Sequence, residues 1–231
     1  MANEQQAELQ DLSADELKAR ANSVFEQYRT PIFVVIGSIL ALVVGAYWYI
    51  TMYKAPREKE AQIELYRATL EFQRDSLNVA LNGNTLTAAP GQANTILGFT
   101  GIIEDYSGTE AANLAHYYAG ATTLRLGQPQ LALQFLDAYS GEAAIQTQAY
   151  HLMGDAHSEL GDMETALNYY EKAANGTSND ALTLYAKYKA ARLMEFQGKL
   201  AEAKAYYQAI MDTDAKMAES MGVDKDLVRL Q

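Results

Sequence analysis

The sequence contains no cysteine and only four prolines among its 231 residues. The absence of cysteine excludes disulfide bonds, thiol nucleophiles and thiolate metal sites. It leaves the cellular compartment open, because a large domain outside the cytosol can do without disulfides. The scarcity of proline leaves long stretches, rich in Ala, Leu, Gln and Glu, that favour helix. Composition therefore predicts an all-α chain without covalent cross-links.

Positive charge is also scarce. The chain has 18 Lys and Arg against 29 Asp and Glu, a net charge of −11, and it lacks the basic stripe or arm of a nucleic-acid-binding protein. It also lacks a phosphate-binding glycine loop, a nucleophile elbow and an HExxH motif. We therefore expect no enzyme activity, cofactor, bound metal, small-molecule substrate or nucleic-acid partner.

One long stretch carries no charge of either sign. It spans residues 32–53, IFVVIGSILALVVGAYWYITMY, and about 20 apolar residues are enough to cross the bilayer core. Tyr and Trp gather at its C-terminal end, as at a membrane interface. A cleaved signal peptide fits less well, because a long acidic tail comes first and no clear cleavage site follows; a buried core helix is the other alternative. We predict one transmembrane helix over residues 31–53.

This span divides the chain into three parts. Residues 1–30 are a polar tail, in which a capping box at residues 13–16 and an apolar stripe predict a short amphipathic helix before Pro31. Residues 54–231 are the predicted folded domain. Lys and Arg occur on both sides of the span, so the positive-inside rule does not decide its orientation.

Small residues recur inside the span at Gly37, Ala41 and Gly45. They stand four residues apart and form a smooth stripe along one side of a helix. Such a stripe permits close packing against a second membrane helix, although Gly and Ala are common in membrane helices without any such role.

A second pattern of small residues recurs in the C-terminal half. Its members are Gly120, Gly127, Ala132 and Leu136, then Gly154, Gly161, Ala166 and Tyr170, then Ala191, Gly198, Ala203 and Tyr207. A small–Gly–Ala–aromatic order with a period of about 34 residues is typical of tetratricopeptide repeats. The small residue lets two helices approach, the glycine permits a left-handed turn, and the alanine lies where the helices cross. The bulky residue is expected to fill the gap towards the next hairpin.

Flanking segments complete the predicted solenoid. Residues 57–106 resemble a longer first hairpin with helices at about 57–81 and 92–106, and residues 215–230 a capping helix, as terminal repeats require. The predicted fold class is thus all-α: a single transmembrane helix followed by a tetratricopeptide-repeat right-handed solenoid of about four hairpins plus a capping helix.

The concave face of this solenoid is the candidate protein-binding surface. One stripe of each first helix is expected to line it, and tyrosines among polar groups suit an extended polypeptide. The stripe comprises Leu114, Tyr117, Ala121, Leu124 and Arg125, then Gln148, His151, Asp155, Ser158 and Glu159, then Tyr185, Tyr188, Arg192, Glu195 and Phe196. Alternatively, these rings pack against the long first helix or the capping helix. His151, Asp155 and Glu159 share a helix face that could contact a cation, but a solvated polar face is the favoured interpretation.

Three stretches carry a resemblance to a known family: KAPREKEAQ after the span, GFTGIIEDYSGTEAANLAHYYAGATTLRLGQ from residue 98, and GDMETALNYYEKAA from residue 161. With the short tail and single span, they resemble membrane-anchored tetratricopeptide-repeat proteins of Bacteroidetes, which are similar to the ancillary subunit of the bacterial Sec translocon. The resemblance implies a single-pass protein of the bacterial inner membrane, with a cytoplasmic N-terminus and periplasmic repeats. Its implied partners are the Sec translocon, a periplasmic membrane-anchored chaperone and emerging polypeptides.

The same resemblance implies O-glycosylation at Ser76, within Asp75-Ser76-Leu77, although a three-residue match also arises by chance. A second function stays open beside the translocon role, namely a cytosol-facing membrane-anchored adaptor that recruits soluble partners. Only Arg125 and Arg192 bring positive charge to the predicted stripe, which counts against an adaptor that clamps carboxylate tails.

Overall fold

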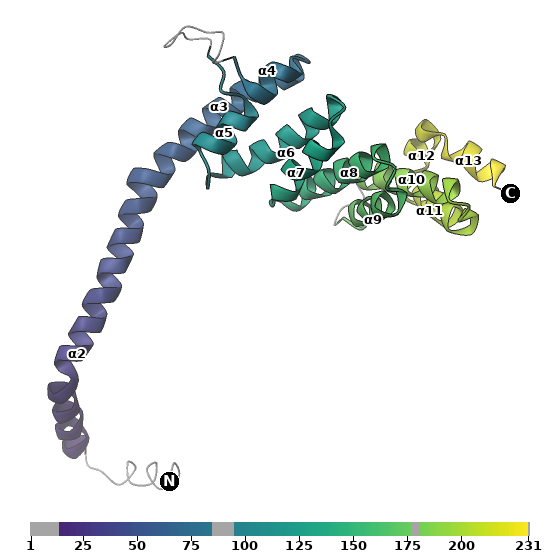
Figure 1. Ribbon diagram of the computed structural model, residues 1–231. Helices are drawn as coiled ribbons and strands as arrows, with labels where there is room; N and C mark the ends of the chain where they lie inside the picture. The colour runs from purple at the N-terminus through teal and green to yellow at the C-terminus, as the bar shows by residue number, and fades with distance from the viewer. Residues whose placement is uncertain (1–13, 85–94, 177–180, 231) are drawn as a thin grey trace. The chain divides into compact units, whose positions relative to one another are not determined.

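The computed structural model describes residues 14–84, 95–176 and 181–230, and every regular element in these ranges is a helix (Figure 1). The chain divides into two compact units, Met1–Pro56 and Arg57–Gln231. The start of the predicted capping box at Ser13 and the predicted helix start near Gln92 lie outside the described residues.

The described part of the first unit contains α2 (Ala14–Trp48) and η1 (Tyr49–Lys54), a π-helical segment. Pro31 lies inside α2, so the predicted break before the span is wrong. A proline removes one backbone hydrogen bond and strains a helix by about 3 kcal/mol, yet α2 continues through Pro31 to Trp48.

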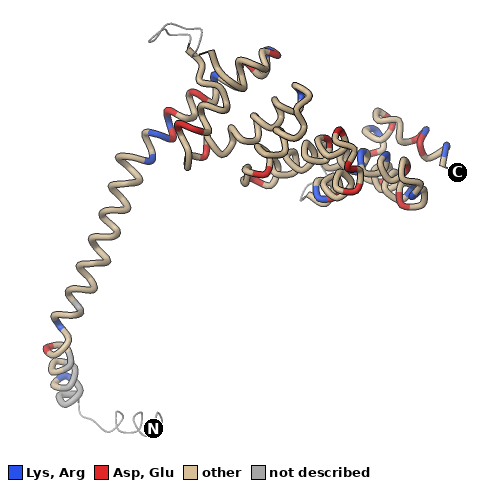
Figure 2. The backbone as a smooth tube through the Cα atoms, in the orientation of Figure 1, with Lys and Arg blue, Asp and Glu red and all other residues tan. Residues whose placement is uncertain are grey.

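One helix among the described residues, Phe25–Gln73, is long and apolar enough to cross a membrane, judged by length and composition alone. Its most apolar window has no buried part, and Figure 2 shows the corresponding run of the chain without a charged residue. The predicted packing stripe is open as well, because a Cβ added to Gly37 or Gly45 would meet no atom within 4 Å.

Three helical hairpins form most of the second unit, as predicted. α6 (Glu110–Arg125) packs on α7 (Pro129–Ala138), α8 (Ala143–Glu159) on α9 (Met163–Ala174), and α10 (Ala181–Phe196) on α11 (Leu200–Thr213). Each hairpin then contacts the next through its second helix, α7 against α8 and α9 against α10. The apolar faces are therefore buried by stacking between neighbours, as in other solenoids.

The turn in each hairpin is closed by a left-handed glycine. Gly127, Gly161 and Gly198 have φ of 72°, 79° and 78°. In the first turn the Gly127 N–H donates to the Leu124 carbonyl at 2.9 Å, and the next N–H donates to the Thr123 carbonyl at 2.9 Å. This pair of bonds is a Schellman cap, and the predicted role of the glycines is confirmed.

The small and bulky residues of a repeat meet inside their own hairpin. A Cβ on Gly120 would lie 2.5 Å from Leu136 Cγ, and one on Gly154 would lie 2.6 Å from the Tyr170 ring. Leu136 also packs in a cluster with Met153 of the next hairpin. The bulky residue thus fills the space left by its own glycine as well as the predicted gap between hairpins.

The predicted helix over residues 57–81 is broken into α3 (Ala55–Gln73) and α4 (Leu77–Asn82). Asp75 adopts a φ of 64°, its N–H donates to the Phe72 carbonyl at 3.2 Å, and the Ser76 N–H donates to the Glu71 carbonyl at 2.9 Å. These are the bonds of the other Schellman caps. Aspartate can replace glycine here because its short polar side chain tolerates the left-handed region.

Asp75 sets the register of a first repeat. Ala68 precedes it by the interval that separates Gly120 from Gly127, and Ala80 follows it as Ala132 follows Gly127. Both Ala68 and Ala80 are 0% exposed, as their places in a hairpin require. Residues 57–106 therefore contain the predicted first hairpin.

The second helix of this first hairpin is interrupted. α5 (Gly98–Asp105) begins where α4 ends in space, since a Cβ on Gly98 would lie 2.2 Å from the Gly83 nitrogen. The Thr100 hydroxyl also donates to the Leu81 carbonyl at 2.8 Å. α4 and α5 together take the place of one helix, and Phe99, 0% exposed, occupies the position of the bulky residue.

The C-terminal cap consists of two helices, α12 (Ala215–Met221) and α13 (Val223–Arg229), and both pack on α11. The predicted single helix over residues 215–230 is therefore wrong. Gly222 separates the two helices with a φ of 81°, and Val223, fully buried, joins the cluster that contains Ile210.

Candidate protein-binding groove

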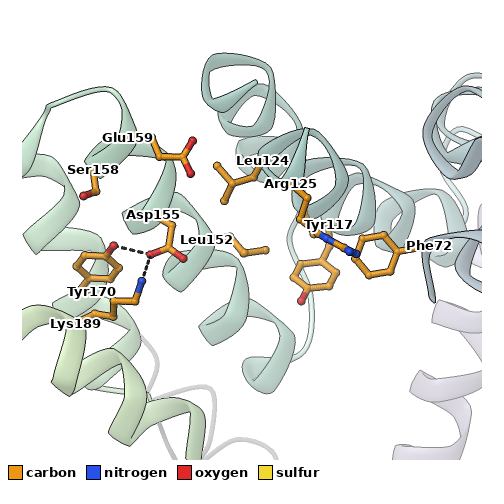
Figure 3. A pocket seen from close by; sticks show the side chains of 11 residues that line it. Phe72, Tyr117, Leu124, Arg125, Leu152, Asp155, Ser158, Glu159, Tyr170 and Lys189 are labelled. Carbon is orange, nitrogen blue, oxygen red and sulfur yellow. Dashed lines mark hydrogen bonds and ion pairs between the residues drawn. The ribbon is translucent and has the colours of Figure 1, made fainter. Parts of the chain in front are cut away.

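Two adjoining hollows lie along the first helices of the hairpins. The larger has a volume of about 530 Å³ and is lined by Phe72, Tyr117, Ala121, Leu124, Arg125, Leu152, Asp155, Ser158, Glu159, Tyr170 and Lys189 (Figure 3). The smaller has a volume of about 270 Å³ and is lined by Ser158, Met163, Tyr170, Lys189, Arg192, Leu193 and Phe196. Because they share three of these residues, we treat the hollows as one surface and call it the repeat groove.

The repeat groove contains part of the predicted stripe. Its members from that stripe are Tyr117, Ala121, Leu124, Arg125, Asp155, Ser158, Glu159, Arg192 and Phe196. The other predicted residues, namely Leu114, Gln148, His151, Tyr185, Tyr188 and Glu195, are not among the lining residues. That the repeat groove binds protein stays a prediction.

Sequence reasoning missed four residues of the larger hollow. Phe72 stands three residues before Asp75, as Leu124 stands three residues before Gly127. Recognising Asp75 as the turn residue of the first repeat would therefore have identified Phe72. Leu152 and Lys189 each stand two residues before the small residue of their repeat, on a row next to the predicted one. Tyr170 reaches the hollow from the second helix of its hairpin, because the missing side chain of Gly154 leaves it room.

Asp155 is the centre of the polar wall. Its Oδ1 accepts a hydrogen bond from the Tyr170 hydroxyl at 2.6 Å and an ion pair from Lys189 Nζ at 3.1 Å. Burial raises the pKa of Tyr170, and the bond to Asp155 raises it further, so the phenol stays protonated and donates. These contacts join α8, α9 and α10, and they occupy the Asp155 oxygen with groups of the chain itself.

His151 serves the packing of the repeats. Its ring stacks on Tyr185 with centroids 5.1 Å apart, and its Nδ1 lies 3.6 Å from the Asp155 carboxylate. Burial lowers the pKa of His151, while Asp155 acts in the opposite sense. Since Asp155 is bound by Lys189 and His151 is neutral, this face is built for helix packing. The described residues hold no group of three or more metal-ligating side chains.

The two ends of the predicted stripe are covered by the chain itself. At one end Arg125 pairs with Asp75 at 2.6 Å and lies over the Phe72 ring at 4.9 Å. At the other end Glu195 pairs with Arg229 of α13, whose hydrogen bond lowers the pKa of Glu195. Charged residues at both ends of the stripe thus meet the first hairpin and the capping helices, while the alternative that its aromatic rings pack there stays a prediction.

A hydrogen bond also joins two residues of the predicted stripe to each other. The Tyr117 hydroxyl donates to Gln148 Oε1 at 2.6 Å, which links α6 to α8. Burial raises the pKa of Tyr117 to about 12, so the phenol donates this bond throughout the physiological range. Tyr117 therefore presents only part of its ring to the repeat groove.

Two side chains of the repeat groove are left open. Phe196 is 78% exposed, although it is a large apolar residue. Glu159 is exposed, and among the described residues it makes no hydrogen bond or ion pair. By contrast, the other charged side chains of the larger hollow are all paired.

The predicted modification site lies beside the repeat groove. Ser76 is the N-cap residue of α4, and its side chain makes no capping bond. Its neighbour Asp75 carries the cap and the ion pair to Arg125. O-glycosylation at Ser76 stays a prediction.

Comparisons with known proteins agree with this fold. A tetratricopeptide-repeat family model matches residues 147–175, the hairpin of α8 and α9. No curated protein matches the chain. A putative kinesin light chain of Podosopora anserina with nearly identical TPR-like repeats aligns over 75% of this chain and 86% of its own, with a TM-score of 0.51 and 14% identity. MamA aligns over 74% of this chain and 87% of its own, with a TM-score of 0.48 and 14% identity.

At these identities the likeness to solved structures extends to the fold alone. Residues 147–175 match a tetratricopeptide repeat, and the chain has a TPR-like solenoid fold. Tetratricopeptide repeats mediate protein–protein interactions, and the second unit has the fold of such a scaffold.

Proposed function

We propose that this protein is a membrane-anchored scaffold whose repeat groove binds segments of other polypeptides. The observation that carries the proposal is the open part of the repeat groove. It presents an exposed aromatic ring at Phe196, apolar side chains such as Leu152, and polar groups that can meet a peptide backbone. Aromatic side chains beside polar groups supply much of the affinity of protein interfaces.

The membrane part of the proposal rests on the first unit. Its uncharged stretch is as long as a bilayer core requires, and none of its most apolar window is covered by the protein. A helix of this composition needs an apolar environment from outside the chain, and the acyl region of a bilayer supplies one.

The cellular setting is proposed from the resemblance alone. The resembling family places the N-terminus in the cytoplasm of a bacterium and the repeats in the periplasm, beside the Sec translocon. There the repeat groove would meet emerging polypeptides and a membrane-anchored chaperone. The protein would then act as an ancillary translocon subunit with chaperone-like contacts.

Site-specific photo-crosslinking tests the binding face. A photoreactive phenylalanine analogue at Ser158, which lines both hollows, should crosslink to a purified unfolded client. The matched control is the same analogue at exposed Asn168 on α9, outside both linings. Equal yields at the two positions, or none at Ser158 in a correctly folded protein, would exclude the repeat groove as the binding face.

Protease added to intact spheroplasts tests the orientation. Residues 57–231 should be digested from outside while the N-terminal tail is spared. Repeats that are protected in spheroplasts and cut in lysates would rule out the periplasmic setting and the translocon role with it. That result would favour the cytosol-facing adaptor, which uses the same repeat groove for soluble partners.

A further inference from the structure

We infer that the repeat groove selects segments in which a basic side chain stands about three residues from a large apolar one. The inference deepens the proposed function and rests on it. It comes from the two open side chains, Glu159 and Phe196, and from the pairing of the charges in the larger hollow. In the smaller hollow, Arg192 donates to the Tyr188 hydroxyl at 3.1 Å.

The charge preference follows from which ions are already paired. Arg125 is paired with Asp75 and Lys189 with Asp155, so neither cation is free to attract an acidic ligand. Glu159 is the charged side chain of the larger hollow that is still open to a partner among the described residues. A segment that brings a Lys or Arg to it gains an ion pair, and one that brings Asp or Glu meets repulsion.

The wider charge distribution acts in the same direction. Between residues 101 and 171 the sequence has one basic residue, Arg125, among many acidic ones. The excess of acidic side chains in this part of the chain favours the approach of a basic segment over an acidic one.

The apolar preference follows from Phe196. This ring borders the smaller hollow, which Met163 and Leu193 also line, and most of its surface faces solvent. A large apolar side chain placed there covers the ring and removes its own surface from water, which is the main source of affinity at such contacts.

The spacing follows from the repeat register. Glu159 and Phe196 hold the same place in their repeats, each two residues before the turn glycine, Gly161 or Gly198. Their helices, α8 and α10, are in contact. Packed helices lie about 8–10 Å apart, and an extended peptide advances about 3.3 Å per residue. One peptide can therefore reach both side chains with residues about three positions apart.

Peptide binding to the full chain in detergent or nanodiscs tests the inference. The probes are fluorescent peptides of equal length with Lys-x-x-Phe, Glu-x-x-Phe or Lys-x-x-Ser in a Gly/Ser background, followed by fluorescence anisotropy. The Lys-x-x-Phe peptide should bind about tenfold more tightly than either of the others. Its affinity should fall as salt is raised, because exposed ion pairs are screened.

Variants assign the preference to the two side chains. Glu159→Gln should weaken Lys-x-x-Phe about fivefold and leave Glu-x-x-Phe no weaker, whereas Phe196→Ala should weaken both Phe peptides. Glu164→Gln is the charge-matched control, since Glu164 is exposed on α9 and outside both linings; it should change nothing. Circular dichroism checks that each variant folds.

The outcomes separate the inference from the function beneath it. If lysine and glutamate peptides bind equally, or Glu159→Gln and Glu164→Gln act alike, the selectivity is refuted while polypeptide binding stands. If neither these peptides nor an unfolded client binds the folded full chain, the proposed function fails and the inference with it.

Discussion

The two units use the same kinds of apolar side chain in opposite ways. In the first unit, Leu42 is 73% and Tyr47 is 70% exposed, whereas in the second unit Phe99 and Tyr207 are 0% exposed. Each buried side chain of this size contributes about 1.5–3 kcal/mol, which the first unit does not obtain from its own chain. Stacked repeats therefore bury their apolar side chains against one another, whereas the N-terminal helix depends on its surroundings to cover its apolar surface.

Removal of residues 1–53 tests this difference with the largest expected effect. The remaining fragment should be soluble without detergent, strongly helical and cooperatively unfolded, because its hairpins bury one another. The full chain should need detergent. Circular dichroism and sedimentation of both proteins check the result, and an insoluble or mainly unfolded fragment would show that the repeats depend on the N-terminal helix.

Paired glycine substitutions give the next largest effect. Gly154→Leu should destabilise the repeats by about 2–3 kcal/mol, because even a Cβ there lies 2.6 Å from the buried Tyr170 ring. In the matched variant, Gly45→Leu, the added Cβ meets no atom within 4 Å, so the substitution should leave the repeats unchanged. Urea unfolding measured on both full-length variants compares them.

Gly45→Leu has a second expected readout. If the predicted stripe of Gly37, Ala41 and Gly45 packs on a membrane partner, the substitution should reduce co-purification of that partner. An unchanged set of partners would show that the stripe is incidental.

Asp155→Asn should have a smaller effect. It removes the charge that holds Lys189 and weakens the bond from Tyr170, at a cost of about 1–2 kcal/mol to the repeats. Glu159→Gln, four residues along the same helix and unpaired, is the matched control and should cost almost nothing. A loss of equal size in both variants would contradict the assigned network.

The smallest effect concerns pH. Burial lowers the pKa of His116 and His151 in the folded state, so below about pH 6.5 the unfolded chain binds protons that the folded chain does not. Stability of the repeats should be constant above that pH and decline below it. Carboxylates with lowered pKa values, such as Glu195, change the stability of the repeats only below about pH 4.5.

Urea midpoints of the fragment between about pH 7.5 and pH 5 measure this decline. His116→Gln combined with His151→Gln should flatten it. All three histidines of the chain lie in the second unit, so the detergent requirement of the full chain should not vary over the same range. A midpoint that rises on acidification would reverse the assigned direction.

The regular part of the fold could be predicted because its signals are local. Each turn glycine marks the end of a helix, and each small residue marks a close approach, so three hairpins follow from letters at fixed intervals. The first hairpin was predicted, but its register and its helix bounds were not, for two reasons. Its turn residue is Asp75, a type that forms a left-handed cap only when the surrounding chain favours it, and its second helix is interrupted between Gly83 and Gly98.

The candidate site was predicted only in outline, because pairing depends on tertiary contacts. The helical period placed Arg125, Asp155 and Glu159 on one face. It could not show that Asp75 and Lys189 neutralise the first two, since those partners come from other repeats. The charged side chains that remain without an ion-pair partner can therefore be identified only from the stacked repeats.

The stacking of α7 on α8 and of α9 on α10 has a mechanical consequence. A pull between the ends of the solenoid is carried from hairpin to hairpin in series, since each repeat is held mainly by its neighbours. Under such a force the least stable interface between two repeats is expected to separate before the others. Because the repeat groove spans these interfaces, tension on the chain would loosen a bound segment one contact at a time.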